Sequence, residues 1–259
     1  FLKYRQLGVA VPGGIEIAWH TVDAALQKME ADADGDADDM PVALAWDAED
    51  AFPNCWRSEL FAKTQQYVPS LLAYTQQLYG GDGTIMAISK GELIRSWTCR
   101  DGVWQGDPLG VHHMVLSVLG FVQEMLEYAP PDLAMDEHQT SRLVTAVHVT
   151  IADDLTQVVR RRHVLQLARW MIRTAPKYGM RLNLSKWQIY MPRHRHEHDV
   201  TQLALCHTLQ AMGSRVSSEG LDRLLGAPIG RMHFCVADGG QLDKVADKAV
   251  SYVKAIDNL

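Results

Sequence analysis

Apolar residues recur along the chain at two spacings, which predict a mixture of helices and short strands. Helical spacing predicts helices over residues 16–29, 56–68, 71–79, 107–128, 163–178 and 242–255. Short apolar or β-branched runs predict strands over residues 41–46, 84–89, 93–99, 144–151, 155–159 and 188–191. No linker rich in Pro, Gly and Ser divides the sequence, so the pattern predicts one compound α+β domain.

Turn residues sharpen several of these boundaries. Pro69 separates two helices, and Lys90-Gly91 closes a hairpin between two strands. Asp107 followed by Pro108 favours a helix start, because Asp caps free amides and Pro needs no donor at the first helical position. Residues 225–230 contain two glycines and a proline and predict a further turn.

Composition limits the class of protein. The chain has 259 residues, of which 47% are hydrophobic and 22% charged, enough to bury a core. The four cysteines share no metal-binding or disulfide spacing, which indicates free thiols and an intracellular protein. No uninterrupted apolar stretch approaches about 18 residues, so we expect no transmembrane helix, no signal peptide and no membrane partner. A first residue other than Met suggests a piece of a longer protein.

The formal charge of -6 at first argues against a nucleic-acid partner, because affinity for phosphates comes from clustered Lys and Arg. The charge is unevenly distributed, however. Residues 30–39 hold six of the 31 acidic residues, which leaves 25 against 25 Lys and Arg. Residues 155–195 contain ten Lys or Arg and no Asp or Glu. A local basic stretch of this kind is compatible with binding to nucleic acid.

Three carboxylates occupy positions that favour a metal site. Asp47 follows an apolar strand, and Asp153-Asp154 lie between two β-branched runs, as at the tip of a hairpin. An isolated Asp pair is usually an ordinary turn, and a strand-end Asp is often a cap. If the two strands are neighbours, three converging carboxylates repel one another unless cations neutralise them. A pair of Mg²⁺ ions held in this way supports phosphoryl transfer.

Two other polar clusters have simpler interpretations. Residues 30–39 could be a calcium loop, but Ala37 and Ala43 stand where that loop needs Gly and Glu. Residues 193–199 alternate His with charged residues, a spacing that fits no common structural zinc site. We expect both segments to be solvated loops.

Five segments, taken in order, resemble the palm motifs of reverse transcriptases of the non-LTR retrotransposon and group II intron type. They are Asp47-Ala-Glu-Asp-Ala-Phe52, Gln105-Gly-Asp-Pro-Leu-Gly110, Ile151-Ala-Asp-Asp154, Gly179-Met-Arg-Leu-Asn183 with Lys186, and Leu225-Gly-Ala-Pro-Ile-Gly230. Upstream, Gln6-Leu-Gly8 with Gly13-Gly14 and His20 resembles the end of the fingers motif. The resemblance implies an α+β right-hand polymerase palm, an antiparallel sheet with helices packed on one face, with partial fingers and no thumb.

The resemblance implies a metal site and its reaction. Asp47 and Asp153 would be catalytic and hold two Mg²⁺ ions, with Asp154 beside them as a third catalytic ligand. Mn²⁺ is an alternative ion. The reaction would be RNA-directed DNA synthesis, in which the 3′-OH of a DNA primer on an RNA template attacks the α-phosphate of a dNTP.

The same resemblance implies contacts with substrate. Phe52 would lie under the deoxyribose and exclude a 2′-OH. Gln105 and Gly106 would lie under the nascent base pair, Gly allowing close approach and Gln offering hydrogen bonds. Lys186 would neutralise or protonate the leaving pyrophosphate.

Three arginines, Arg160, Arg161 and Arg162, directly follow the predicted catalytic hairpin. Two interpretations stay open for them: a solvated face, or contact with phosphates of the primer or template. The chain also departs from the family, because Ile151 stands where an aromatic residue is usual, which affects the positioning of nucleotide and primer. The early fingers motif is missing, with Lys3 and Arg5 as substitutes for its basic residue, and the thumb is absent. We therefore expect weak polymerisation and weak, salt-dependent duplex binding by these residues alone.

Along the sequence, the resemblance implies partial fingers and the acidic loop over 1–40, palm with the first motif over 41–79, a fingers/palm hairpin over 80–106, palm with the catalytic hairpin over 107–230, and the palm end or thumb connection over 231–259. Two alternatives stay open. One is an inactive reverse-transcriptase-like scaffold that binds RNA or protein, against which the carboxylates argue. The other is an RNA-dependent RNA polymerase, against which Phe52 argues. The chain would belong to a larger polyprotein or reading frame, nuclear if from a eukaryotic retrotransposon and cytoplasmic if bacterial.

Overall fold

Two compact units make up the chain in this computed structural model. Residues 7–8, 11–34, 36–127, 145–192, 200–224 and 227–231 are described, with Cys235, Gln241, Lys244, Ala246 and Asp247. Unit 1 comprises Phe1–Asp47, Ala129–Leu167 and Asn183–Leu259, and unit 2 comprises Ala48–Tyr128 and Ala168–Leu182. Both units draw on distant segments, and the division into five consecutive segments stays a prediction. None of the described helices is long and apolar enough to cross a membrane.

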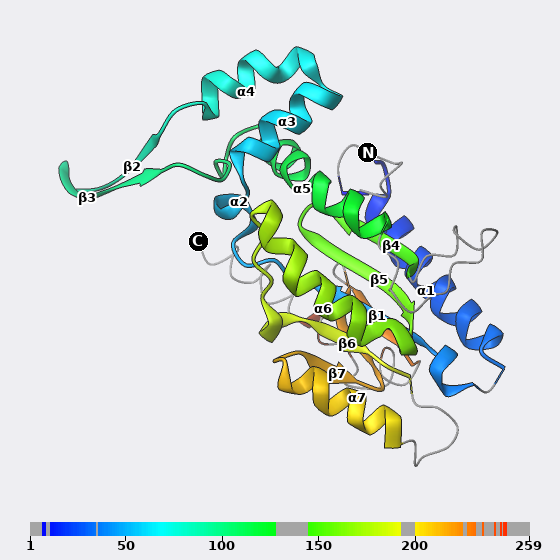
Figure 1. Cartoon of the computed structure of the whole chain (residues 1–259). Helices are drawn as coiled ribbons and strands as arrows, with labels where there is room; N and C mark the ends of the chain where they lie inside the picture. Colours follow the sequence, from blue (N-terminus) through cyan, green and yellow to red (C-terminus); the bar gives the residue numbers. More distant parts are fainter. Residues whose placement is uncertain are drawn as a thin grey trace. The chain divides into compact units, whose positions relative to one another are not determined.

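A five-stranded sheet forms the centre of unit 1, in the order β4-β5-β1-β6-β7 (Figure 1). Its strands are β4 (Thr145–Ile151), β5 (Asp154–Arg160), β1 (Pro41–Trp46), β6 (Gln188–Tyr190) and β7 (Arg215–Ser217). Neighbouring strands are antiparallel except β6 and β7, which are parallel. The sheet departs from the predicted antiparallel pairing at this edge, because helix α7 (Val200–Ala211) lies between β6 and β7 and returns the chain in the same direction.

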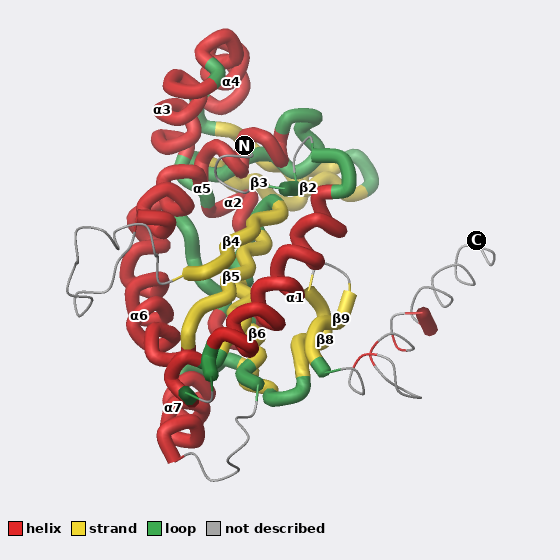
Figure 2. Tube along the Cα trace, turned by 90° about the vertical axis from the view of Figure 1, so that its right-hand side faces the viewer, coloured by secondary structure: helices red, strands yellow, loops and turns green. Residues whose placement is uncertain are grey.

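Helix α1 (Gly14–Asp32) covers one face of this sheet, as Figure 2 shows. Its buried residues recur at helical spacing and form one apolar stripe, which confirms the predicted helix. They pack in a core cluster with residues that point from the strands toward the helix: Ala18, Val22, Leu26 and Met29 against Ala43, Val149, Val158 and Tyr190. The sheet is thereby fixed on this side by apolar burial.

Short elements complete the described part of unit 1. They are the 3-10 turns η2 (Ala37–Asp39), η4 (Arg161–His163) and η6 (Leu184–Lys186), helix α7 (Val200–Ala211), and strands β8 (Gly220–Leu224) and β9 (Ala227–Gly230). The predicted turn over 225–230 is wrong in its last four residues, which pair with β8. Pro228 is tolerated in β9 because β9 is an edge strand of a sheet with two described strands. The predicted helix over 242–255 lies largely outside the described residues, as does the His-rich segment 193–199.

Unit 2 is mainly helical. It contains α2 (Ala51–Asn54), α3 (Arg57–Tyr67), η3 (Pro69–Leu71), α4 (Leu72–Tyr79), α5 (Gly110–Glu127) and η5 (Ala175–Tyr178), and α6 (Val164–Thr174) enters it from unit 1. The helices predicted on both sides of Pro69 are confirmed. Within the core, Phe121 of α5 stacks on Trp170 of α6 at 5.8 Å between ring centroids.

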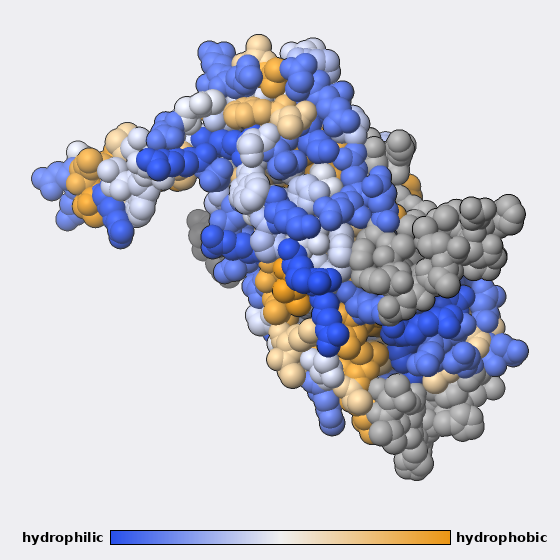
Figure 3. All heavy atoms as spheres, viewed as in Figure 1, coloured by the Kyte–Doolittle hydropathy of each residue, from blue (hydrophilic) through white to orange (hydrophobic). Residues whose placement is uncertain are grey.

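A hairpin of β2 (Gly83–Ser89) and β3 (Glu92–Cys99) projects from this helical unit, at the left of Figure 1. Its strands and its Lys90-Gly91 turn are as predicted. Large apolar side chains are exposed on both strands, where Figure 3 shows hydrophobic atoms at the surface: Ile85, Met86, Ile88, Leu93, Ile94 and Trp97. Among the described residues, β2 and β3 form a sheet of two strands only.

Candidate active site

Strand register brings Asp47 and Asp153 to the same end of the sheet. Trp46 pairs with Leu155, so Asp47 emerges from β1 beside the start of β5. Ile151 pairs with Asp154, which leaves Ala152 and Asp153 as the turn of the β4–β5 hairpin. The prediction placed both Asp153 and Asp154 at the tip, whereas Asp154 is the first residue of β5 and is exposed.

The environment of Asp153 disfavours its charged form. Burial raises the pKa of the Asp153 carboxyl, a backbone hydrogen bond lowers it, the Asp47 carboxylate raises it, and Lys186 lowers it, with a net rise. Lys186 Nζ lies 3.5 Å from Asp47 Oδ2. That oxygen is nevertheless buried without a hydrogen-bond partner in the described part of the chain. The two carboxylates are therefore close together, as the sequence predicted, and Lys186 lies beside them, while one carboxylate oxygen has no hydrogen bond from the described residues.

Two tryptophans hold the strand ends that carry these groups. Trp46, directly before Asp47, packs edge-on against Trp187, directly after Lys186, with ring centroids 3.8 Å apart. Trp46 Nε1 also donates a hydrogen bond to Gln157 Oε1 at 2.7 Å. Both rings are buried, so apolar contacts in the core hold the backbone next to Asp47 and Lys186 in place.

The tip of the β4–β5 hairpin is tightly packed from the N-terminal side. Leu7 N donates to Thr150 O at 2.8 Å, and a Cβ on Gly8 would lie 2.8 Å from Ala152 N. Only glycine fits at position 8 without moving this backbone. Ala152 has a φ of 55°, a left-handed conformation that is unfavourable for a residue with a side chain. Backbone strain is thus located next to Asp153.

Asp47 and Asp153 are the residues to compare with the coordination chemistry of a divalent cation. No three His, Cys, Asp or Glu side chains gather closely enough to hold a metal ion among the residues with described positions. The role of Asp154 as a third ligand stays a prediction. Mg²⁺ in phosphoryl-transfer sites is nonetheless held by one or two carboxylates together with substrate phosphates and waters. The donorless Asp47 oxygen beside Asp153 fits that coordination chemistry.

The predicted substrate-binding residues Phe52, Gln105 and Gly106 all lie in unit 2. Gln105 and Gly106 are the central residues of a turn closed by a hydrogen bond from Asp107 N to Trp104 O at 3.2 Å. Gly106 has a φ of 98°, which the third position of a type II turn requires. Val103 N donates to Phe52 O at 2.8 Å, so α2 and the segment leading into this turn are joined.

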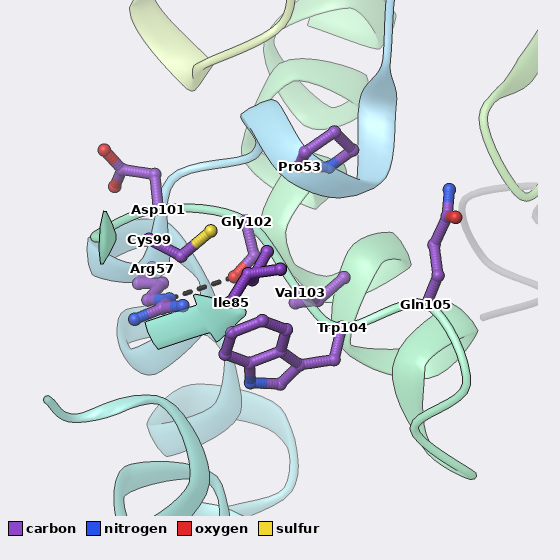
Figure 4. Close-up of a pocket in the computed structure, with 9 residues that line it drawn as sticks. All are labelled: Pro53, Arg57, Ile85, Cys99, Asp101, Gly102, Val103, Trp104 and Gln105. Carbon is purple, nitrogen blue, oxygen red and sulfur yellow. Dashed lines mark hydrogen bonds between the residues drawn. The ribbon is translucent and has the colours of Figure 1, made fainter. Parts of the chain in front are cut away.

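The region before this turn also lines a pocket of about 270 Å³ (Figure 4). Arg57 lies in its wall and is buried. Its Nε donates to Gly102 O at 2.9 Å, and its Nη1 donates to Gly81 O at 2.9 Å. Gly81 precedes β2 and Gly102 follows β3, so one guanidinium joins both ends of the hairpin to α3. The observed contacts of Arg57 are structural ones.

The three consecutive arginines have different surroundings. Arg160 Nη1 lies 3.1 Å from Asp39 Oδ2, and Arg162 also forms an ion pair with Asp39. Arg161 is buried, with its amide donating to Met40 O at 2.9 Å. The part of the acidic segment nearest β1 is therefore a 3-10 turn that faces these arginines. Their predicted contact with nucleic-acid phosphates stays a prediction, and any phosphate would compete with Asp39.

Sequence reasoning missed Asp39 as a partner of the arginines, although the opposite charge of the two segments was visible. It also missed Tyr79, whose hydroxyl accepts from Trp104 N at 3.2 Å and donates to Asp107 Oδ2 at 2.6 Å. A tyrosine at the end of a predicted helix carries no local signal for such a role. All four cysteines are free, as predicted.

The architecture is shared with telomerases. Apo telomerase from Candida tropicalis truncated from the C-terminal domain superposes with a TM-score of 0.52 at 11% identity, covering 86% of this chain and 38% of that one. Apo telomerase from Candida tropicalis superposes with a TM-score of 0.50 at 10% identity, covering 86% and 35%. The chain thus spans little more than a third of these telomerases. No family model and no curated protein matches the sequence.

Telomerase has a fold related to that of reverse transcriptases, so the chain has a reverse-transcriptase-like fold with a palm-like α+β sheet. The likeness concerns the fold, because function depends on the residues of the site rather than on the architecture.

Proposed function

We propose that this chain is the RNA-directed DNA polymerase domain of a retroelement of the non-LTR retrotransposon or group II intron type. The observation that carries the proposal is the pairing of Asp47 with Asp153 at one end of the sheet, beside Lys186. Burial and the nearby Asp47 carboxylate raise the pKa of Asp153, and one lysine faces two carboxylates, so their mutual repulsion is only partly offset. A divalent cation bound with substrate phosphate would remove that cost.

Asp47 and Asp153 would hold Mg²⁺ or Mn²⁺, and Asp154, which is exposed, would join them as a third ligand. When bound, the metal ions would activate the primer 3′-OH and neutralise the charge of the transferred phosphoryl group. Lys186 would hold a proton at Nζ and deliver it to the departing pyrophosphate. Its 3.5 Å separation from Asp47 Oδ2 supports this role, because the lysine side chain reaches the carboxylate site.

Unit 2 would supply nucleotide selection. Phe52 would place its ring against the deoxyribose and exclude a 2′-OH, which distinguishes dNTP from rNTP. Gln105, exposed on its turn, would hydrogen-bond the nascent base pair, and the adjacent Gly106 leaves open space. The chain would act on a DNA primer annealed to an RNA template. Arg160 and Arg162 would contact its phosphates when released from Asp39.

Single-turnover incorporation tests the proposal. The 259-residue chain, in excess over a DNA primer annealed to an RNA template at low salt, is given one dNTP and Mg²⁺. Low salt and enzyme excess compensate for the weak binding expected of this chain. We expect slow addition of dNMP, lost at least about a hundredfold in Asp153→Asn, because catalytic carboxylates contribute several kcal/mol. Asp38→Asn, which removes an exposed carboxylate elsewhere in unit 1, should retain the wild-type rate.

The outcomes separate the rival functions. Incorporation of rNMP in preference to dNMP would indicate an RNA-dependent RNA polymerase. Binding of the RNA–DNA duplex without incorporation, and without change in Asp153→Asn, would indicate a scaffold. Phe52→Ala provides a further test, because it should relax discrimination against rNTP while the carboxylate site is unchanged.

A further inference from the structure

The turn that carries Gln105 and Gly106 is closed twice. The first closure is the backbone hydrogen bond from Asp107 N to Trp104 O. The second is made by the hydroxyl of Tyr79, at the end of α4. It accepts a hydrogen bond from Trp104 N at 3.2 Å and donates one to Asp107 Oδ2 at 2.6 Å. One side-chain oxygen thus joins the first and last residues of the turn.

A buried network fixes the carboxylate that receives this hydrogen bond. Asp107 Oδ1 accepts from Leu109 N at 3.0 Å, and Asp107 Oδ2 also lies 3.0 Å from His113 Nδ1. His113 Nε2 lies 3.2 Å from Thr75 Oγ1. The side chains of Asp107 and His113 are only 3% and 1% exposed. Because a buried carboxylate is costly unless every partner is in place, this network holds Asp107 in one position.

The shared proton between Tyr79 and Asp107 belongs to the tyrosine. Burial would raise the pKa of the Asp107 carboxyl, but hydrogen bonds from Tyr79, Leu109 and His113 outweigh it and lower that pKa. Burial, and then the hydrogen bond to Asp107, raises the pKa of Tyr79 far above its ordinary value. The proton therefore stays on Tyr79 and the negative charge on Asp107. The Tyr79 hydroxyl acts as a permanent donor at one end of the turn.

The series Thr75, His113 and Asp107 has the order of a nucleophile, a base and an acid. It does not act on a substrate, because Thr75 is fully buried and its hydroxyl donates to Leu71 O at 2.9 Å. The network instead supports the Trp104–Asp107 turn, part of which is exposed to solvent. Gln105 is exposed there, and its side chain extends away from the Trp104 ring (Figure 4).

We propose that Tyr79 is a positioning residue that sets the conformation of the Trp104–Asp107 turn and so the direction in which Gln105 meets an incoming nucleotide. The nucleotide part of this inference rests on the proposed function. A Cβ on Gly106 would meet none of the described atoms within 4 Å, so they leave the outer surface of the turn open to a ligand. Tyr79 acts from the inner side and touches no substrate.

Tyr79→Phe removes the hydroxyl and keeps the ring. The matched control is Tyr178→Phe in the same unit, since Tyr178 donates to Glu124 Oε2 at the same distance of 2.6 Å. Two quantities are measured in each variant: amide hydrogen exchange of Trp104 and Asp107, and the Kd for the fluorescent nucleotide mant-dATP with Mg²⁺. We expect Tyr79→Phe to speed exchange of both amides about tenfold and to weaken mant-dATP binding about fivefold, as loss of a charge-assisted hydrogen bond predicts.

The control decides between positioning and general destabilisation. Tyr178→Phe should leave both amides and the Kd at wild-type values, and equal exchange rates in the two variants would overturn the proposal. If Tyr79→Phe unfolds, Gly106→Ala replaces it: an Ala at a φ of 98° strains the turn without touching the buried network, and it should weaken mant-dATP binding to a similar extent. Unchanged affinity in Gly106→Ala would also overturn the proposal. Failure of the wild type to bind mant-dATP would overturn the proposed function, while the exchange rates would still decide the role of Tyr79.

Discussion

The two hairpins β4–β5 and β2–β3 have the same local construction in different surroundings. Each has a two-residue turn whose first residue is left-handed without being glycine: Ala152 with a φ of 55° and Lys90 with a φ of 52°. In β5, every residue from Leu155 to Val159 is buried, whereas every residue of β3 from Glu92 to Thr98 is exposed. Similar turns are therefore carried by a buried strand in one hairpin and by an exposed strand in the other.

The difference in burial shows which hairpin can hold a carboxylate in an unfavourable position. Asp153 is brought close to another carboxylate, which is unfavourable, and this is sustained because β5 is paired on both sides within a sheet. The β2–β3 hairpin pairs with no third strand in the described part of the chain, and Arg57 ties its base to its unit. An isolated two-stranded ribbon is only marginally stable, so we expect the position of Lys90-Gly91 to be less fixed than that of Ala152-Asp153.

Matched leucines measure the contrast most strongly. Leu155 and Leu93 are each the second residue of the return strand, with exposures of 4% and 59%. We expect Leu155→Ala to lower the free energy of unfolding by about 2 to 5 kcal/mol, because it leaves a cavity. Leu93→Ala should change it by no more than about 0.5 kcal/mol. Urea unfolding measures both, and equal effects would mean that the exposed hairpin is covered in solution.

Glycine substitutions in the turns give a smaller effect. Ala152→Gly should stabilise the protein by about 1 kcal/mol, because glycine removes the cost of the left-handed conformation. Lys90→Gly should give a similar gain, since its φ is nearly the same. Denaturation midpoints test the pair. A gain in one hairpin alone would show that the turns, and not only their supports, differ.

The outer end of β5 offers a third test. Asp39→Asn should break the ion pairs with Arg160 and Arg162. Binding of an RNA–DNA duplex should then tighten about two- to fivefold. The slope of log Kd against log salt concentration should increase by about one, as expected for one more phosphate contact. Fluorescence anisotropy over a salt series measures both. Asp38→Asn removes an equal charge from the same turn without those ion pairs. An equal gain in the two variants would mean that net charge alone matters.

The smallest effect concerns pH. Because the pKa of Asp153 is raised in the folded state, its contribution favours folding at low pH and is lost as pH rises through that pKa. Asp153→Asn should therefore be more stable than the wild type at neutral pH, and the difference should shrink on acidification. Mg²⁺ should stabilise only the wild type. Urea unfolding over a pH series, with and without Mg²⁺, tests this, and a variant less stable at neutral pH would contradict it.

Much of the fold follows from local patterns. β1 coincides with its predicted range because an apolar run is bounded by Pro41 and by the polar residues after Trp46. Both hairpins were predicted from their turns. Strands β7 and β8 were not, because they are short, partly polar and set by pairing partners rather than by periodicity. The parallel edge of the sheet is likewise a tertiary property.

The site divides in the same way. Asp47 and Asp153 could be predicted to meet because Asp47 follows a strand and Asp153 lies at a hairpin tip. Antiparallel pairing of the two strands then places both residues at the same end of the sheet. The pairing of Asp39 with Arg160, 121 residues away, and the hydrogen bonds of Tyr79 depend on side-chain positions that no local pattern encodes. The role of Asp154 as a third ligand was inferred from resemblance, and it stays a prediction.

Metal binding by Asp47 and Asp153 is the central claim, and NMR with Mn²⁺ tests it most directly. Paramagnetic broadening of backbone amides locates the ion without requiring polymerisation. We predict broadening around Asp47, Ala152 and Asp153 that is reversed by excess Mg²⁺ and lost in Asp153→Asn, while Asp38→Asn behaves as the wild type. Broadening centred on the acidic residues 32–39, or unchanged in Asp153→Asn, would contradict the account.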